Sequence, residues 1–297
     1  MKLTRRHFLL GSSALALSTS LPRLAQAQTS TISWSALRGD DKDFFRAPVL
    51  LSGEKQAILI DGSFNLPAGE QMAALIKDSG KQLTTIYISC PDPDYYFSLK
   101  PIKAAFPEAR VIAARETIEA IDASVQGKLD TWGPQLGEFG PQTQEDIVFA
   151  EAFDEKRLML EDQPIDIVTS QRLHDRRYLW VPSLNAVVGG VYAFDGLHVW
   201  TADSPTKQDR QHWIAELDEL IARDPAVVVA GHAASGTNNG VASLRFTREY
   251  LLAFERAFDE TGNSEELIAA MQARYPDLGL MPALEIGAKV SKGEMDW

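Results

Sequence analysis

LTTIYISCPDPD, residues 83–94, is the stretch that decides the fold, because an apolar, β-branched run ends at Ser89 and a loop stiffened by two prolines begins. The run predicts a buried strand. In an extended loop alternate side chains point the same way, so Cys90, Asp92 and Asp94 are expected to converge. A thiolate and two carboxylates after a strand favour a divalent metal site. Proline and aspartate are also the usual residues of turns, so a polar turn is an equal alternative.

Strands and helices alternate on both sides of this stretch. The expected elements of the first half are a hairpin of 47–52 with 56–61, helices at 68–79 and 99–106, and a strand at 110–114. Those of the second half are strands at 147–149, 157–160, 165–168, 178–181, 186–190 and 226–230, and helices at 207–222, 243–259 and 264–273. Strand–helix–strand units predict parallel pairing, and antiparallel hairpins flank them. The sum predicts an α+β fold, a four-layer αββα sandwich rather than a doubly wound sheet.

The first 27 residues predict export. Arg5 and Arg6 give a basic start, residues 8–21 give a mostly apolar middle, and residues 25–27 give a small-residue cleavage site. The string TRRHFLL resembles the twin-arginine pattern, which is an address read by a receptor and not an anchor. An ordinary secretion signal is the weaker alternative. We therefore expect a periplasmic or secreted protein that has the twin-arginine translocation machinery as a partner.

The remaining chain is expected to have a loose segment, residues 28–43, and one domain, residues 44–297. Cleavage after Ala27 removes four basic residues and no acidic ones, which takes the formal charge from −12 to −16. So acidic a domain argues against nucleic acid and against an anionic membrane surface as partners. No membrane insertion is expected after cleavage, and a small-molecule substrate or ligand is the expected partner. Cys90 is the single cysteine, so no intramolecular disulfide can form.

From the hairpin that ends at Asp61 to Gly231-His232, the chain resembles the metallo-β-lactamase superfamily, whose fold is αββα. The main signature of that family, His-x-His-x-Asp-His, aligns with residues 90–95, CPDPDY, where Asp94 alone is identical. Asp61 resembles the buried carboxylate behind the metal loop of the family, although a turn aspartate is an equally good interpretation.

The resemblance also implies later ligands. His232 matches the family's Gly-His step after a buried strand, and His174 lies at a looser spacing before a strand pair. Gly190 replaces the aspartate that bridges two metals, and Tyr95 replaces another ligand of the second metal. A two-metal site clamps the attacking and the leaving oxygen, so these losses argue against a dinuclear centre.

A single Zn²⁺, or another divalent metal, remains compatible with the resemblance. Its expected ligands are Cys90, Asp92 and His232, with His174 as a further possibility, and Asp94 would be the general base. This predicts a metal-dependent hydrolase acting on a small ester, thioester or lactone-type substrate. The alternative is a non-catalytic periplasmic binding or interaction module that keeps the fold after losing metal ligands. A true β-lactamase is the weakest interpretation, and whether the protein is an enzyme stays open.

Overall fold

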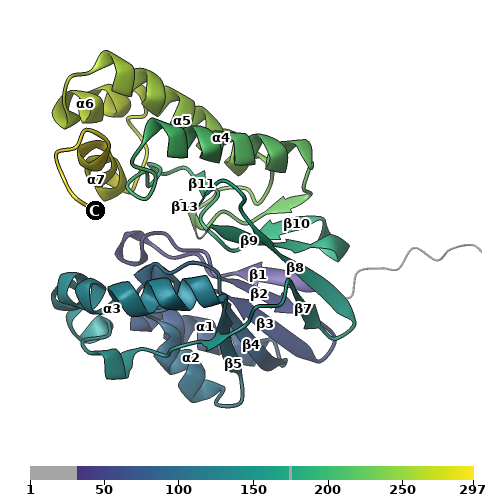
Figure 1. Ribbon diagram of the computed structural model, residues 1–297. Coiled ribbons are helices and arrows are strands. Elements are labelled where there is room, and N and C mark those ends of the chain that lie inside the picture. Colours follow the sequence, from purple (N-terminus) through teal and green to yellow (C-terminus); the bar gives the residue numbers. More distant parts are fainter. Residues whose placement is uncertain (1–31, 174–175) are drawn as a thin grey trace, which may run out of the picture.

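The computed structural model describes residues 32–173 and 176–297, and within these ranges a pair of β-sheets lies face to face with helices on both outer sides (Figure 1). The first sheet has the strand order β1 (Ser33–Ala36), β2 (Val49–Ser52), β3 (Gln56–Ile60), β4 (Gln82–Ile88), β5 (Arg110–Ala113) and β6 (Glu151–Ala152). The second has the order β12 (Val227–Val228), β10 (Ala186–Val188), β9 (Arg177–Val181), β8 (Gln163–Thr169) and β7 (Arg157–Leu160). The predicted αββα sandwich is confirmed.

The helices form the two outer layers (Figure 1). On the side of the first sheet lie α1 (Leu66–Asp78), α2 (Leu99–Ala105) and α3 (Arg115–Leu136). On the side of the second sheet lie α4 (Lys207–Ala222), α5 (Ala242–Glu260), α6 (Ser264–Arg274) and α7 (Met281–Ser291). A separate pair of short parallel strands, β11 (Phe194–Asp195) and β13 (His232–Ala233), places Phe194 opposite His232.

Pairing in the first sheet determines which residues meet at one of its edges. β2 and β3 pair antiparallel, with Val49 opposite Ile60, whereas β3 and β4 pair parallel, with Ile60 opposite Tyr87. β4 and β5 are also parallel. The hairpin and the parallel units predicted from the sequence are thus confirmed. Because β3 and β4 run in the same direction, the residues that follow them, Asp61 and Ser89, come together.

Alternation along the strands divides the core into separate layers. Ile58 and Ile60 of β3 belong to the apolar layer between the sheets, whereas Ala57 and Leu59 belong to the layer under the helices. The second sheet contributes Leu158, Leu160, Ile165, Leu179, Val181 and Val188 to the layer between the sheets. Full burial of one such aliphatic side chain is worth about 1.5–3 kcal/mol relative to exposure, so this layer holds the two sheets together.

Some local predictions are corrected by the structure. Within residues 28–43, which were expected to be loose, β1 pairs antiparallel with β2, and Trp34 packs against the core between the sheets. Residues 147–149 were predicted to be a strand but are not one. The strand in this region is β6, which follows them and pairs with the end of β5. α7 was not predicted. The edge strands β1 and β6 each depend on a partner strand elsewhere in the sequence, so a local pattern does not reveal them.

Residues 1–27, the predicted signal peptide, lie outside the described residues, and so does His174. Across residues 32–173 and 176–297, no helix combines the length and apolar character needed to cross a membrane.

Candidate functional site

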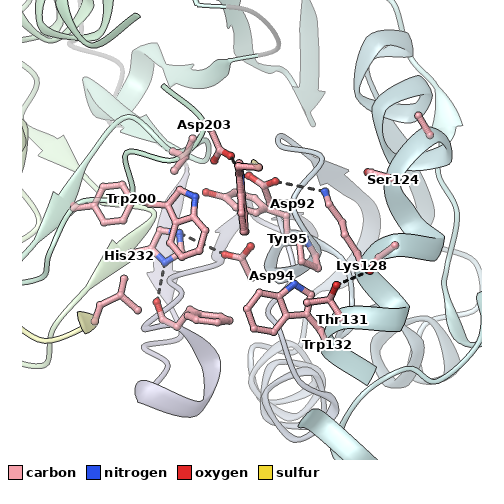
Figure 2. Close-up of a pocket in the computed structure, with 18 residues that line it drawn as sticks. Asp92, Asp94, Tyr95, Ser124, Lys128, Thr131, Trp132, Trp200, Asp203 and His232 are labelled. Carbon is pink, nitrogen blue, oxygen red and sulfur yellow. Dashed lines mark hydrogen bonds and ion pairs between the residues drawn. The ribbon is translucent and has the colours of Figure 1, made fainter. Parts of the chain in front are cut away.

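A cavity of about 610 Å³ lies beside the loop that follows β4 (Figure 2). Its walls come from this loop, from α3 and from loops of the second half of the chain. Aromatic side chains form much of the wall, namely Phe44, Tyr95, Trp132, Phe194, Trp200 and Trp297. The charged side chains in the wall are Asp92, Asp94, Asp203 and Lys128. This cavity is the candidate site, because it brings together residues from both halves of the sandwich.

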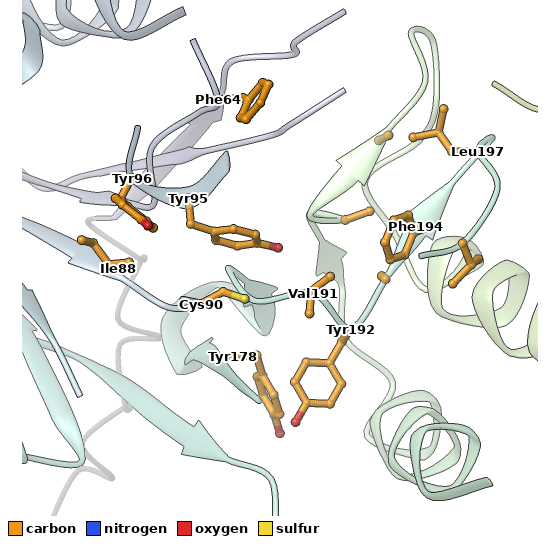
Figure 3. Close-up of a cluster of buried hydrophobic side chains, with 14 of the residues drawn as sticks. Phe64, Ile88, Cys90, Tyr95, Tyr96, Tyr178, Val191, Tyr192, Phe194 and Leu197 are labelled. Atoms are coloured by element: carbon orange, nitrogen blue, oxygen red, sulfur yellow. The ribbon is translucent and has the colours of Figure 1, made fainter. Parts of the chain in front are cut away.

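The loop after β4 contains a tight turn in place of an extended stretch. Pro93–Tyr95 forms a 3₁₀ turn in which the Tyr95 amide donates to the Asp92 carbonyl at 3.0 Å. Asp92 and Asp94 line the cavity, whereas Cys90 is buried in the apolar core near Tyr95 and Val191 (Figure 3). The expected convergence therefore holds for Cys90 and Asp92, whose side chains are hydrogen-bonded, whereas Asp94 lies on the turn and faces Arg46 and His232.

Cys90 is a neutral thiol in this setting. Its Sγ donates to Asp92 Oδ2 at 3.1 Å. Burial, followed by the negative charge of Asp92, raises the pKa of Cys90 well above its ordinary value. The Cys90 thiol is therefore engaged by its hydrogen bond to Asp92.

The Arg46 side chain is buried behind the cavity wall, with 1 % of its surface exposed. Its Nε donates to the Asp94 carbonyl at 3.0 Å, and its Nη1 donates to the Gly231 carbonyl at 2.6 Å. The guanidinium also lies 3.7 Å from Asp61 Oδ2 and 3.4 Å from Asp94 Oδ2. Its central carbon stands 3.6 Å from the centre of the Tyr95 ring, a cation–π contact. Arg46 thus joins segments that are far apart in the sequence.

Sequence reasoning missed Arg46. The signal that could have found it is one charged residue in an otherwise apolar run, FFRAPVLL, that leads into a buried strand. Arginine in such a position must satisfy its donors inside the protein, so it marks a buried polar cluster.

His232 and Asp94 face each other at the wall of the cavity (Figure 2). His232 Nδ1 lies 2.7 Å from the Phe44 carbonyl, and because a carbonyl can only accept, Nδ1 carries the proton. This leaves Nε2 pointing at Asp94 Oδ2, 3.4 Å away. The imidazole also stacks on Phe194 with an interplanar angle of 5°. The structure therefore orients His232 toward the loop that the sequence singled out.

Burial moves the pKa values of this pair in opposite directions. Desolvation, aided by the positive charge of Arg46, lowers the pKa of His232 to about 3, so its ring is neutral at pH 7. Desolvation raises the pKa of Asp94 to about 7, with Arg46 opposing the shift and Asp92 adding to it. Asp94 consequently changes its charge near neutral pH.

Asp61 lies behind this loop, as the resemblance implied. Its carboxylate accepts hydrogen bonds from the Ser89 amide at 2.7 Å and from the Ser89 hydroxyl at 2.8 Å. The Ser89 hydroxyl in turn accepts from the Gly190 amide at 2.8 Å. The Tyr95 hydroxyl donates to the Gly190 carbonyl at 3.2 Å. Asp61 and Tyr95 therefore link the two sheets through Gly190.

The described residues do not fit a metal ion. Among them, no group of three His, Cys, Asp or Glu side chains is arranged to hold one. Asp92 lies 3.5 Å from Lys128 Nζ, besides accepting from Cys90. The carboxylates of Asp61 and Asp94 already face the guanidinium of Arg46. A divalent cation next to that fixed positive charge would be repelled, so the expected set of Cys90, Asp92 and His232 does not form a metal centre within residues 32–173 and 176–297.

Gly190 has no room for a side chain. A Cβ there would lie 2.1 Å from the Arg177 carbonyl oxygen, and the backbone has a φ of +71°, which L side chains rarely adopt. The position that the resemblance aligns with a bridging aspartate is therefore closed to any carboxylate in this backbone conformation.

Of the comparisons with known proteins, the one with solved structures bears on the fold. No protein-family model matches the chain, and no curated protein matches it. Among solved structures, the crystal structure of DIM-1 metallo-beta-lactamase matches with a TM-score of 0.51 and 13 % identity, over 75 % of this chain and 93 % of that chain. The crystal structure of VMB-1 matches with a TM-score of 0.49 and 14 % identity, over 76 % and 94 %. The first likeness shows a fold of the metallo-β-lactamase type, and at this identity it shows the fold alone.

Replacing Arg46 by methionine should lower the free energy of unfolding by about 3–5 kcal/mol, because the carboxylates of Asp61 and Asp94 lose their buried counter-charge. Urea unfolding followed by circular dichroism measures this. Arg256→Met, at an exposed position of α5, is the matched control and should change stability by less than about 0.5 kcal/mol. Equal effects of the two substitutions would contradict a central role for Arg46.

Gly190→Ala should destabilise the protein by more than about 2 kcal/mol, since it adds a clash with a backbone carbonyl to the cost of the positive φ. Gly80→Ala separates the two effects, because Gly80 has a φ of +67° and an added Cβ there would meet nothing within 4 Å. We expect a cost of about 1–2 kcal/mol there. Thermal unfolding of both variants would reveal the difference, and a smaller loss for Gly190→Ala would count against the close packing at Gly190.

Proposed function

We propose that this protein is an exported binding protein for a small organic molecule, which it holds in the cavity without a metal ion. The observation that carries the proposal is the Arg46 guanidinium, which lies among the groups from which a metal centre would have to be built. Its positive charge acts to lower the pKa values of four neighbouring groups, Asp61, Asp94, His232 and Tyr95. This favours the binding-module interpretation over a metal-dependent hydrolase acting on esters, thioesters or lactones.

A buried arginine supplies positive charge but none of the chemistry of a metal. Its Nε and Nη1 already donate to the Asp94 and Gly231 carbonyls, and it has no open coordination position that could activate water. The cavity itself remains. Its volume of about 610 Å³ falls within the range of roughly 300–1,000 Å³ that small-molecule sites have.

The proposed location outside the cytoplasm rests on the sequence of residues 1–27, with Arg5 and Arg6 before an apolar run. Under this proposal the translocation machinery is a transient partner, and the domain meets its ligand in the periplasm or outside the cell. The acidic composition supports a small molecule as that ligand and argues against polyanions.

Titration with Zn²⁺ tests the absence of a metal centre. Calorimetry on the exported protein, together with elemental analysis, should give no stoichiometric zinc, and Cys90→Ser and His232→Ala should leave the titration unchanged. One zinc per chain that is lost in both variants would overturn the proposal and restore the mononuclear hydrolase.

A second candidate function is hydrolysis without a metal, with Asp94 as general base. The observation that favours it is the Asp94 carboxyl at the cavity wall, 3.4 Å from a histidine nitrogen that carries no proton. A base whose pKa lies near the working pH is suited to remove a proton from water.

If Asp94 is such a base, hydrolysis of p-nitrophenyl acetate should rise about tenfold between pH 6 and pH 8. The carboxylate is the active form, and the pKa of Asp94 near 7 places its ionisation in that window. Asp94→Asn should abolish the pH-dependent component, and Asp92→Asn, on the same loop, should keep it. A rate no higher than that of the buffer would reject this candidate and leave the binding proposal untouched.

A further inference from the structure

We propose that the cavity binds a small organic cation with apolar substituents, such as a quaternary ammonium ion. This inference rests on the proposed binding function and names the ligand class of that site. It depends on the aromatic walls, on the carboxyl groups set among them, and on the lack of an equal positive charge facing the same space.

The aromatic walls offer faces to a cation. In Figure 2 the rings of Trp132 and Trp200 border the same space as the carboxyl groups of the three aspartates. Trp132 is held at 5.5 Å from Phe44, and Trp200 at 5.2 Å from Trp297, both edge to face. Such contacts restrict the rings without covering every face. Tryptophan is the aromatic side chain that attracts cations most strongly, so these rings suit a soft, weakly hydrated ammonium group.

The cavity wall carries more acidic than basic side chains. Asp92, Asp94 and Asp203 line it, and Lys128 is the basic residue among the described lining residues. Lys128 Nζ donates to the Pro91 carbonyl at 2.7 Å and lies 3.5 Å from Asp92 Oδ1, so it offsets the charge of Asp92. His232 is neutral. Lys128 also acts on Asp203, as does Arg176 from outside the lining, whereas Asp94 has no positively charged side chain beside it among the described lining residues.

Asp94 contributes to this wall a buried carboxyl oxygen that has no hydrogen-bond partner in the described part of the chain. Only 8 % of the residue is exposed, and its Oδ2 accepts no hydrogen bond from the described residues. Arg46 and His232 each approach this oxygen only to 3.4 Å. Because Arg46 also faces Asp61, its one positive charge is shared between two carboxylates. An ionised Asp94 therefore leaves negative charge for a bound cation.

Asp203 adds a second carboxyl group from another segment. Its Oδ1 accepts a hydrogen bond from Trp297 Nε1 at 2.6 Å, which fixes the carboxyl group next to the ring pair of Trp200 and Trp297. A carboxylate beside an aromatic face is the combination that recognises alkylated ammonium groups, since charge and dispersion act on the same ligand atoms. The overall acidity of the domain would also draw cations toward the cavity.

Three isosteric probes test the ligand class, namely choline, the neutral 3,3-dimethylbutan-1-ol and the anionic 3,3-dimethylbutanoate. Binding to the exported protein is followed by tryptophan fluorescence and calorimetry. We expect choline to bind at least about tenfold more tightly than the alcohol, and the carboxylate to bind least. Equal or tighter binding of the alcohol or the carboxylate, or no binding of any probe, would overturn the ligand class.

Matched variants locate the site. Asp203→Asn and Trp200→Leu should each weaken choline binding about fivefold or more, and Trp200→Phe should retain most of it because a ring face remains. The controls are Asp162→Asn, at an exposed turn, and Trp34→Leu, on β1, both of which should bind choline as the parent does. Binding that none of the cavity variants weakens would overturn the proposed site.

The two proposals can fail separately. If the neutral alcohol binds best and Trp200→Leu alone weakens it, the cavity is a binding site for uncharged molecules, and only the cation class is wrong. If the zinc titration finds a stoichiometric metal ion, the proposed metal-free function is wrong, whatever choline does.

Discussion

The guanidinium of Arg46 is the interaction on which the rest of this site depends. It contacts the carboxylates of Asp61 and Asp94, the carbonyl of Gly231 and the ring of Tyr95, and water does not reach it. These groups belong to the turn after β3, to the loop after β4 and to the segment before β13. A charge buried this deeply is tolerated only with such partners, so each loop is held in a position that satisfies the arginine. The cavity wall is the outer surface of this arrangement.

Much of the fold could be predicted because its signals are local. The β-branched run before Ser89 and the hairpin around Gly53 show alternating or continuous apolar patterns, and burial on one or both faces of a sheet selects for those patterns. β1 was not predicted because its stability comes from a partner strand distant in the sequence. β1 forms by pairing with the free edge of β2, and neither the residue types of β1 nor their spacing indicates that this edge is available.

The site was only partly predictable, for a related reason. His232 and Asp94 do meet, since His232 forms a β-bridge with Arg46, which also contacts Asp94, and the resemblance placed both near one centre. Asp94 does not join Cys90 and Asp92 because a 3₁₀ turn at Pro93–Tyr95 replaces the extended backbone that the period of two requires. Arg46 was missed because its position beside β2 carries no motif, and only the packed structure shows which groups surround its charge.

The packing at Gly190 has a consequence for how this protein can change. A metal centre of the two-ion kind would need a carboxylate there and an empty space where the guanidinium of Arg46 lies. The first change is blocked by the Arg177 carbonyl, and the second exposes two buried carboxylates to each other before any metal arrives. Each change by itself is expected to weaken the domain. Along routes of single substitutions, a two-metal centre is therefore hard to reach from this structure.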